Sequence, residues 1–128
     1  MKIVLSAALL AMSVTAAAST PDTDPAMLEV AKHSGCITCH AIESSTAKGK
    51  EKPIGPAWQD VARKYHGVPG AESKLTATVM LGSSPYQSHW KDKVSGLAMP
   101  PNAVAIDRPN ARRLVKWILA LPMPKAER

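Results

Sequence analysis

The stretch Cys36-Ile37-Thr38-Cys39-His40 contains the only two cysteines of the 128-residue chain. Two cysteines separated by two residues and followed directly by histidine are typical of a c-type haem attachment site. Each thiol adds across one vinyl group of a porphyrin, so the two sulfurs must reach two fixed points on one rigid ring edge, and a short helical segment gives that spacing. The next residue projects its imidazole under the ring, where a nitrogen can bind iron. The motif therefore predicts one covalently bound haem c, attached at Cys36 and Cys39, with His40 as an axial ligand.

Three other kinds of site also use a Cys-x-x-Cys pair. A thioredoxin-like redox pair is expected in a βαβ context, and the pattern around this pair shows none. A four-ligand zinc site needs two more ligands at matched spacing, whereas His33, His66 and His89 are scattered. A structural disulfide is the third alternative. The histidine directly after the second cysteine favours haem over all three.

The first eighteen residues resemble a secretory signal peptide. Lys2 supplies the positive n-region, residues 3–12 are mostly apolar, and Ala16-Ala17-Ala18 supplies small residues for cleavage. The apolar run is shorter than the roughly 20 residues of a spanning helix, and an uncleaved anchor or a buried helix is the alternative. We therefore expect residues 1–18 to be removed and residues 19–128 to form one domain in the bacterial periplasm, with no membrane span.

The composition is compatible with a core built around a large cofactor. The chain has no Phe, three Trp and two Tyr, so a porphyrin would supply much of the large apolar material. The net charge of +6 either favours redox partners with acidic docking surfaces by steering or only keeps the protein in solution. No long basic run or aromatic–basic interleaving indicates nucleic-acid binding.

The hydrophobic periodicity predicts an all-α chain of about four short helices, with no convincing strand or repeat. The first begins at Asp24-Pro25, as N-cap and first helical residue, and ends before Gly35. The second starts at residue 58 and has its helical spacing up to residue 65, where His66 has a capping position. The third covers about 71–81 and ends at Gly82, and the last starts near Asp107 and ends before Pro122. On the third helix we expect four residues to face inward: Leu75, Thr78, Val79 and Leu81.

The second axial ligand is sought among the methionines after residue 18, which are Met27, Met80, Met99 and Met123. Met27 and Met80 lie within helical patterns, where a buried Met more often fills the core. Met99 lies in a proline-stiffened loop inside a stretch without helical period, and such long stretches in compact domains are usually functional. We therefore predict a His40/Met99 pair, which favours ferrous iron and raises the reduction potential. His89 is the alternative, and a His/His pair would lower the potential.

Three further stretches accompany the haem motif in a recognisable order: Ile54-Gly55-Pro56-Ala57-Trp58, Met99-Pro100-Pro101-Asn102 and Leu114-Val115-Lys116-Trp117-Ile118. With them, the chain resembles a class I cytochrome c of the small bacterial cytochrome c-551 type over most of its length after residue 18. The resemblance implies the class I cytochrome c fold, with its helices wrapped around the haem. It also implies an electron carrier rather than an enzyme.

The resemblance implies roles for further residues. The carbonyl of Pro56 would accept a hydrogen bond from the outer nitrogen of His40 and orient that ring. Asn102 would hydrogen-bond near the Met99 sulfur. Trp90 resembles, more loosely, the family's tryptophan near a haem propionate.

Two loops, residues 43–53 and 83–98, are longer than in the compact members of this family. They lie where the haem edge and a partner surface would be. Lys48, Lys50 and Lys52 in the first loop form either a docking patch or a solvated surface. The loops motivate a second hypothesis, in which the chain is the cytochrome subunit of a periplasmic dehydrogenase, for example a sulfite dehydrogenase. A third hypothesis is a haem enzyme or gas sensor with an open sixth site, which requires that Met99 does not bind iron.

Overall fold

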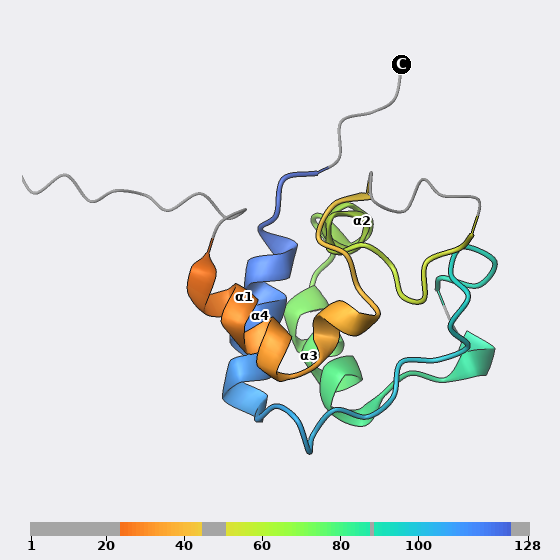
Figure 1. The fold of residues 1–128 in the computed structure, drawn as a ribbon. Coiled ribbons are helices and arrows are strands. Elements are labelled where there is room, and N and C mark those ends of the chain that lie inside the picture. The colour runs from red at the N-terminus through yellow and green to blue at the C-terminus, as the bar shows by residue number, and fades with distance from the viewer. Residues whose placement is uncertain (1–23, 45–50, 88, 124–128) are drawn as a thin grey trace, which may run out of the picture.

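The computed structural model describes residues 24–44, 51–87 and 89–123. In these ranges it has four α-helices, two 3₁₀ turns and no strand (Figure 1). The elements are α1 Pro25–His33, η2 Cys36–Thr38, α2 Trp58–Tyr65, α3 Ala71–Leu81, η4 Pro85–Gln87 and α4 Arg108–Leu119. The all-α fold of four short helices predicted from the sequence is confirmed.

Some expectations fall outside the described part of the chain. The signal peptide expected at residues 1–18 lies there, and so do Lys48 and Lys50 of the first enlarged loop. Lys52 is described and exposed. Among the helices of the described ranges, none is long and apolar enough to cross a membrane.

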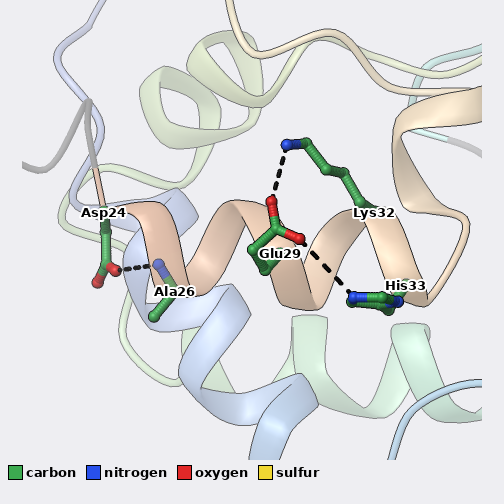
Figure 2. A network of polar contacts seen from close by, with 5 residues as sticks. All are labelled: Asp24, Ala26, Glu29, Lys32 and His33. Atoms are coloured by element: carbon green, nitrogen blue, oxygen red, sulfur yellow. Dashed lines mark hydrogen bonds and ion pairs between the residues drawn. The ribbon is translucent and has the colours of Figure 1, made fainter.

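The start of α1 follows from its first residues. The Asp24 carboxylate accepts a hydrogen bond from the backbone N–H of Ala26 at 3.0 Å (Figure 2). It also accepts one from the N–H of Met27 at 3.3 Å. Pro25 occupies the first helical position, where its missing N–H would have no helical partner. The cap predicted from the sequence is therefore confirmed.

The two sides of α1 differ in what they contact. On the exposed side, Glu29 binds Lys32 at 2.8 Å and lies 3.7 Å from His33 Nε2 (Figure 2). Exposed pairs of this kind contribute little to stability. On the other side, Met27 and Ala31 are buried in the core, and this side holds α1 to the rest of the fold.

Helix α4 is the centre of the core, because α1, α2 and α3 all pack against it (Figure 1). It begins at Asp107, whose carboxylate accepts from the Asn110 N–H at 2.8 Å. Its buried side carries Ala111, Leu114, Val115, Trp117 and Ile118. The basic residues Arg112, Arg113 and Lys116 are exposed. One apolar and one charged side is the pattern that the sequence predicts for this helix.

Helix α3 ends at Gly82, which has φ 81° and so adopts a conformation suited to glycine. Leu75 and Val79 are half-buried and pack against the core. The expectation that Leu81 faces inward is wrong, because Leu81 is 71% exposed. Two residues correspond to about 200° around an α-helix, so Leu81 points away from the side that carries Val79.

The two enlarged loops contact each other. The N–H of Ser95 donates to the Pro53 carbonyl at 2.8 Å, and the N–H of Gly96 donates to the Ile54 carbonyl at 3.0 Å. A Cβ on Gly96 would lie 2.6 Å from the Ile54 carbonyl oxygen, so this approach requires glycine. We call these four residues the joined rim. The second loop also contains the short turn η4.

Candidate cofactor site

A cavity of about 820 Å³ lies between α2, α3, the Cys36–His40 motif and the loop that carries Met99. Its size is in the upper part of the range of cofactor pockets, ~300–1,000 Å³. Much of its wall is apolar and comes from all three of α2, α3 and α4: Val61, Tyr65, Leu75, Val79, Val115 and Ile118. Five of the sequence-predicted site residues, from four separate stretches, also line it: Cys39, His40, Pro56, Trp90 and Met99.

The His40 side of the cavity is held by the Gly55-Pro56 segment. The Gly55 N–H donates to the Cys39 carbonyl at 2.9 Å, and His40 Nδ1 lies 2.7 Å from the Pro56 carbonyl oxygen. Because a carbonyl only accepts, Nδ1 carries the proton in this hydrogen bond, and Nε2 keeps its lone pair. A Cβ on Gly55 would lie 2.7 Å from His40 Cε1, so the ring packs directly on the glycine.

The charge state of His40 suits a metal ligand. Burial lowers the pKa of the imidazole below its ordinary value, and the Pro56 carbonyl acts in the opposite, weaker direction. A lowered pKa means that the ring is neutral at pH 7. Neutral imidazole is the form that binds a metal ion.

Helix α2 connects this motif to the core. Its N-cap residue, Ala57, gives no side-chain cap. The Trp58 N–H instead donates to the Ala41 carbonyl at 2.9 Å, and the next N–H, of Gln59, to the Ile42 carbonyl at 3.0 Å. The two residues after the motif therefore accept the hydrogen bonds of the first two N–H groups of α2.

An aromatic series extends this connection to α4. The Trp58 ring stacks on His40 at 5.9 Å with an interplanar angle of 21°. It also meets Trp117 of α4 edge-on at 5.6 Å and 78°. His40 therefore packs on Trp58, which in turn packs on Trp117 of the central helix.

Cys36 is the first residue of the turn η2 and Cys39 follows its last residue, and both are free, half-buried thiols. Cys39 lines the cavity, whereas Cys36 is not among its lining residues and packs against the core cluster. Burial raises the pKa of the Cys36 thiol, so this group is protonated at neutral pH. Among the described ranges, no three His, Cys, Asp or Glu side chains form a group that could hold a metal ion.

Met99 differs from the other described methionines in its surroundings. Met27 is 3% exposed in the core, Met80 packs against that core, and Met123 is 49% exposed after α4. Met99 is half-buried and lines the cavity. The alternative ligand His89 also lines the cavity, but it is exposed.

Asn102 is directed toward backbone carbonyls rather than the cavity. Its Nδ2 donates to the Pro100 carbonyl at 2.7 Å and to the Val79 carbonyl at 3.3 Å. An amide group has two protons, so both are used here and none is left for the Met99 sulfur. In this structure Asn102 therefore ties the Met99 loop (residues 97–102) to α3, and its implied role near the Met99 sulfur stays a prediction.

Trp90 lines the cavity and is held from outside by Lys64 of α2. Lys64 Nζ lies 5.0 Å from the Trp90 ring centroid and donates to the His89 carbonyl at 3.3 Å. A cation over an aromatic face is attracted by the ring quadrupole. Sequence reasoning missed this role of Lys64, because its partners lie 25 or more residues away and no local pattern announces the pair.

The described residues fit a haem c. The walls are apolar, a neutral imidazole and a thioether face the same cavity, and a thiol lies beside the imidazole. Two glycines, Gly55 and Gly82, stand where a Cβ would come within 3 Å of the residues that carry these groups. Cys36 lies at the other end of η2 from Cys39, within the same short turn.

Comparison with known proteins gives the following relatives. The chain is 40% identical over 89 residues to a cytochrome c-551 from Pseudomonas aeruginosa, covering 70% of each chain. It is 40% identical over 92 residues to a cytochrome c2 from Rhodocyclus tenuis, covering 72% of this chain and 88% of that one. The crystal structure of Nitrosomonas europaea cytochrome c552 has a TM-score of 0.57 and 33% identity, covering 74% of this chain and 99% of that one. No protein-family model matches the chain.

Proposed function

The chain belongs to the class I monohaem cytochromes c of the c-551/c-552 type, and from this premise we propose a periplasmic one-electron carrier with a His40/Met99-ligated haem c. Its relatives are named as cytochromes c, which carry electrons. The family binds one covalently attached haem c, and the two cysteines of this chain match that attachment. The observation that carries the proposal is the cavity that brings Cys39, His40 and Met99 together.

When bound, the haem supplies an Fe(III)/Fe(II) couple. Cys36 and Cys39 would hold it covalently, and Pro56 would keep the imidazole of His40 in one orientation and tautomer. Met99 offers a neutral, soft sulfur, which favours the less charged iron and so a higher potential. The apolar side chains of α2, α3 and α4 exclude water from the site. None of these residues is proposed to transform a substrate.

We prefer Met99 to His89 as the axial ligand because hydrogen bonds hold the Met99 backbone in place. The backbone of Met99 makes two hydrogen bonds to Ser83, and its side chain is half-buried. His89 is exposed on the loop that follows η4, where an axial ligand would have to be held against solvent. A ligand whose backbone is already ordered loses less entropy on binding.

The enlarged loops support a free carrier more than a permanent subunit. A dehydrogenase subunit would cover these loops with its partner. In the joined rim, however, Ser95 and Gly96 already pair with Pro53 and Ile54, so this segment needs no partner for its backbone groups. With a net charge of +6, the partners proposed are redox proteins with acidic docking surfaces, reached by electrostatic steering.

The test uses protein purified from a host that attaches haem. We expect a monomer that gives one reversible one-electron wave and that binds carbon monoxide slowly in the reduced state. Met99→Ala should bind carbon monoxide rapidly and have a lower potential, since it opens the sixth position. His89→Ala is the matched control and should behave like the unaltered protein. The ligand assignment is wrong if His89→Ala opens the site and Met99→Ala does not.

Purification itself separates the free carrier from the subunit. A lone monomer at high salt supports the carrier. Co-elution with a catalytic subunit through high salt would contradict the free carrier and support the dehydrogenase subunit. Rapid carbon monoxide binding by the unaltered reduced protein would instead support a haem enzyme or gas sensor.

A further inference from the structure

Ser83 forms hydrogen bonds with both the N–H and the carbonyl of Met99. The Met99 N–H donates to Ser83 Oγ at 2.8 Å. The Ser83 N–H donates to the Met99 carbonyl at 2.9 Å. Both residues are half-buried, and they are 16 positions apart in the chain. The pair therefore joins the end of α3 to the loop that carries the proposed ligand.

The chain before Ser83 is shaped for this contact. Gly82, with φ 81°, ends α3, and a Cβ there would lie 2.8 Å from the Met99 carbonyl oxygen and 2.9 Å from the Pro101 nitrogen. Any other residue would push the Met99 loop away from the helix end. The close approach that Gly82 allows is what brings the Ser83 hydroxyl within reach of the Met99 N–H.

A second attachment limits the loop on its other side. The backbone N–H of Asn102 donates to the Val79 carbonyl at 3.0 Å, and its side chain donates to the same carbonyl. The loop is thus attached to α3 at Met99 and again three residues later. The pair with Ser83 acts on Met99 itself, whereas Asn102 acts through the two stiff prolines, Pro100 and Pro101.

We propose that Ser83 is a positioning residue, whose hydroxyl holds the Met99 backbone so that the thioether stays directed into the cavity. The inference rests on the proposed function, in which Met99 binds the haem iron. A ligand is retained in proportion to the population of its competent conformation. Loss of one partly buried hydrogen bond should therefore lower the ratio of Met99-bound to Met99-free protein by about two- to tenfold.

The experiment measures this ratio in the haem-loaded protein. Ferric protein with sulfur on low-spin iron has a weak near-red absorption band, which is lost when the sulfur leaves. We would follow this band against temperature in Ser83→Ala, and follow helix content in the same samples by circular dichroism. Ser83→Ala should lose the band at a lower temperature than the unaltered protein, while its helices unfold at nearly the same temperature as before. Its reduction potential should also fall.

Two control variants make the result specific. Ser83→Thr keeps the hydroxyl and should restore the band. Ser84→Ala removes the neighbouring hydroxyl, which is exposed and accepts from the Tyr86 N–H at 3.3 Å, and should change neither measurement. If the band and helix content of Ser83→Ala are lost together at one temperature, its role is only structural and the proposal is wrong. An unchanged band in Ser83→Ala overturns it equally.

The failure of the proposed function gives a different pattern. Met99→Ala is measured alongside and should remove the band altogether. If the unaltered protein has no band, or Met99→Ala retains it, the ligand assignment fails and the positioning role falls with it. A band that requires Met99 but is indifferent to Ser83 overturns the positioning role alone.

Discussion

Gly55 is the single residue on which the geometry of His40 most depends. A Cβ at this position would lie 2.7 Å from His40 Cε1 and 2.9 Å from Nδ1, closer than real contacts allow. The ring cannot retreat without losing its 2.7 Å contact with the Pro56 carbonyl and its stacking on Trp58. The residue type at position 55 is therefore set by the orientation of the proposed axial histidine.

We predict that Gly55→Ala destabilises the haem-loaded protein by about 1–3 kcal/mol, the usual cost of overpacking a well-filled site. It should also perturb the His40 ligation, which we would detect as faster carbon monoxide binding by the reduced protein. Gly67→Ala is the control, because its Cβ meets nothing within 4 Å and only strains a backbone at φ 69°. That variant should lose stability in urea without a change in ligand binding. Identical behaviour of the two variants would contradict the role of Gly55.

At the scale of secondary-structure elements, the parts that sequence predicts best have local signals. Asp24-Pro25 predicts the start of α1 and Asp107 predicts the start of α4, and both Asp carboxylates cap their helices. Gly82 predicts the end of α3. Such signals depend on residues within one turn of each other, so no knowledge of the tertiary structure is needed.

The site is predicted less completely, because its supports are nonlocal. The motif and Met99 are visible in the sequence. The pairing of Asn102 with the Val79 carbonyl depends on where α3 lies. The contact between Lys64 and Trp90 likewise depends on the course of the second loop. Both concern segments brought together only by the fold.

The joined rim leads to a prediction about the two enlarged loops. Gly96→Ala would place a Cβ 2.6 Å from the Ile54 carbonyl oxygen, so we expect the backbone pairing to break. Amide hydrogen exchange at residues 95 and 96 should then become faster by at least tenfold, since local opening controls exchange there. Ser95→Ala is the control, because it removes a 3.3 Å hydroxyl contact but retains the backbone N–H. Unchanged exchange in Gly96→Ala would contradict the rim.

At the scale of the whole molecule, the proposed haem would form part of the core. The 820 Å³ cavity takes much of its wall from apolar side chains of α2, α3 and α4. Covering one such side chain contributes about 1.5–3 kcal/mol, and the net stability of a domain is only ~5–15 kcal/mol. We therefore expect the helices around the cavity to depend on the haem.

We therefore predict that Cys36→Ala/Cys39→Ala, which cannot attach haem, loses the cooperative thermal unfolding of the loaded protein. Circular dichroism should show reduced helix content and a broad transition. Ser34→Ala/Thr38→Ala changes two neighbours of the same turn and serves as the control, with haem attached and unfolding nearly unchanged. A sharp transition at the original temperature in the cysteine variant would show that the helices do not need the haem.

The central claim is that His40 and Met99 both bind the haem iron of this cytochrome c. The most direct measurement is the absorption spectrum of the oxidised protein, with Met99→Ala and His89→Ala recorded beside it. We predict a low-spin spectrum with the weak near-red band of sulfur on ferric iron, retained in His89→Ala and absent from Met99→Ala. A high-spin spectrum of the unaltered protein, or a low-spin spectrum without this band that changes in His89→Ala, would contradict the claim.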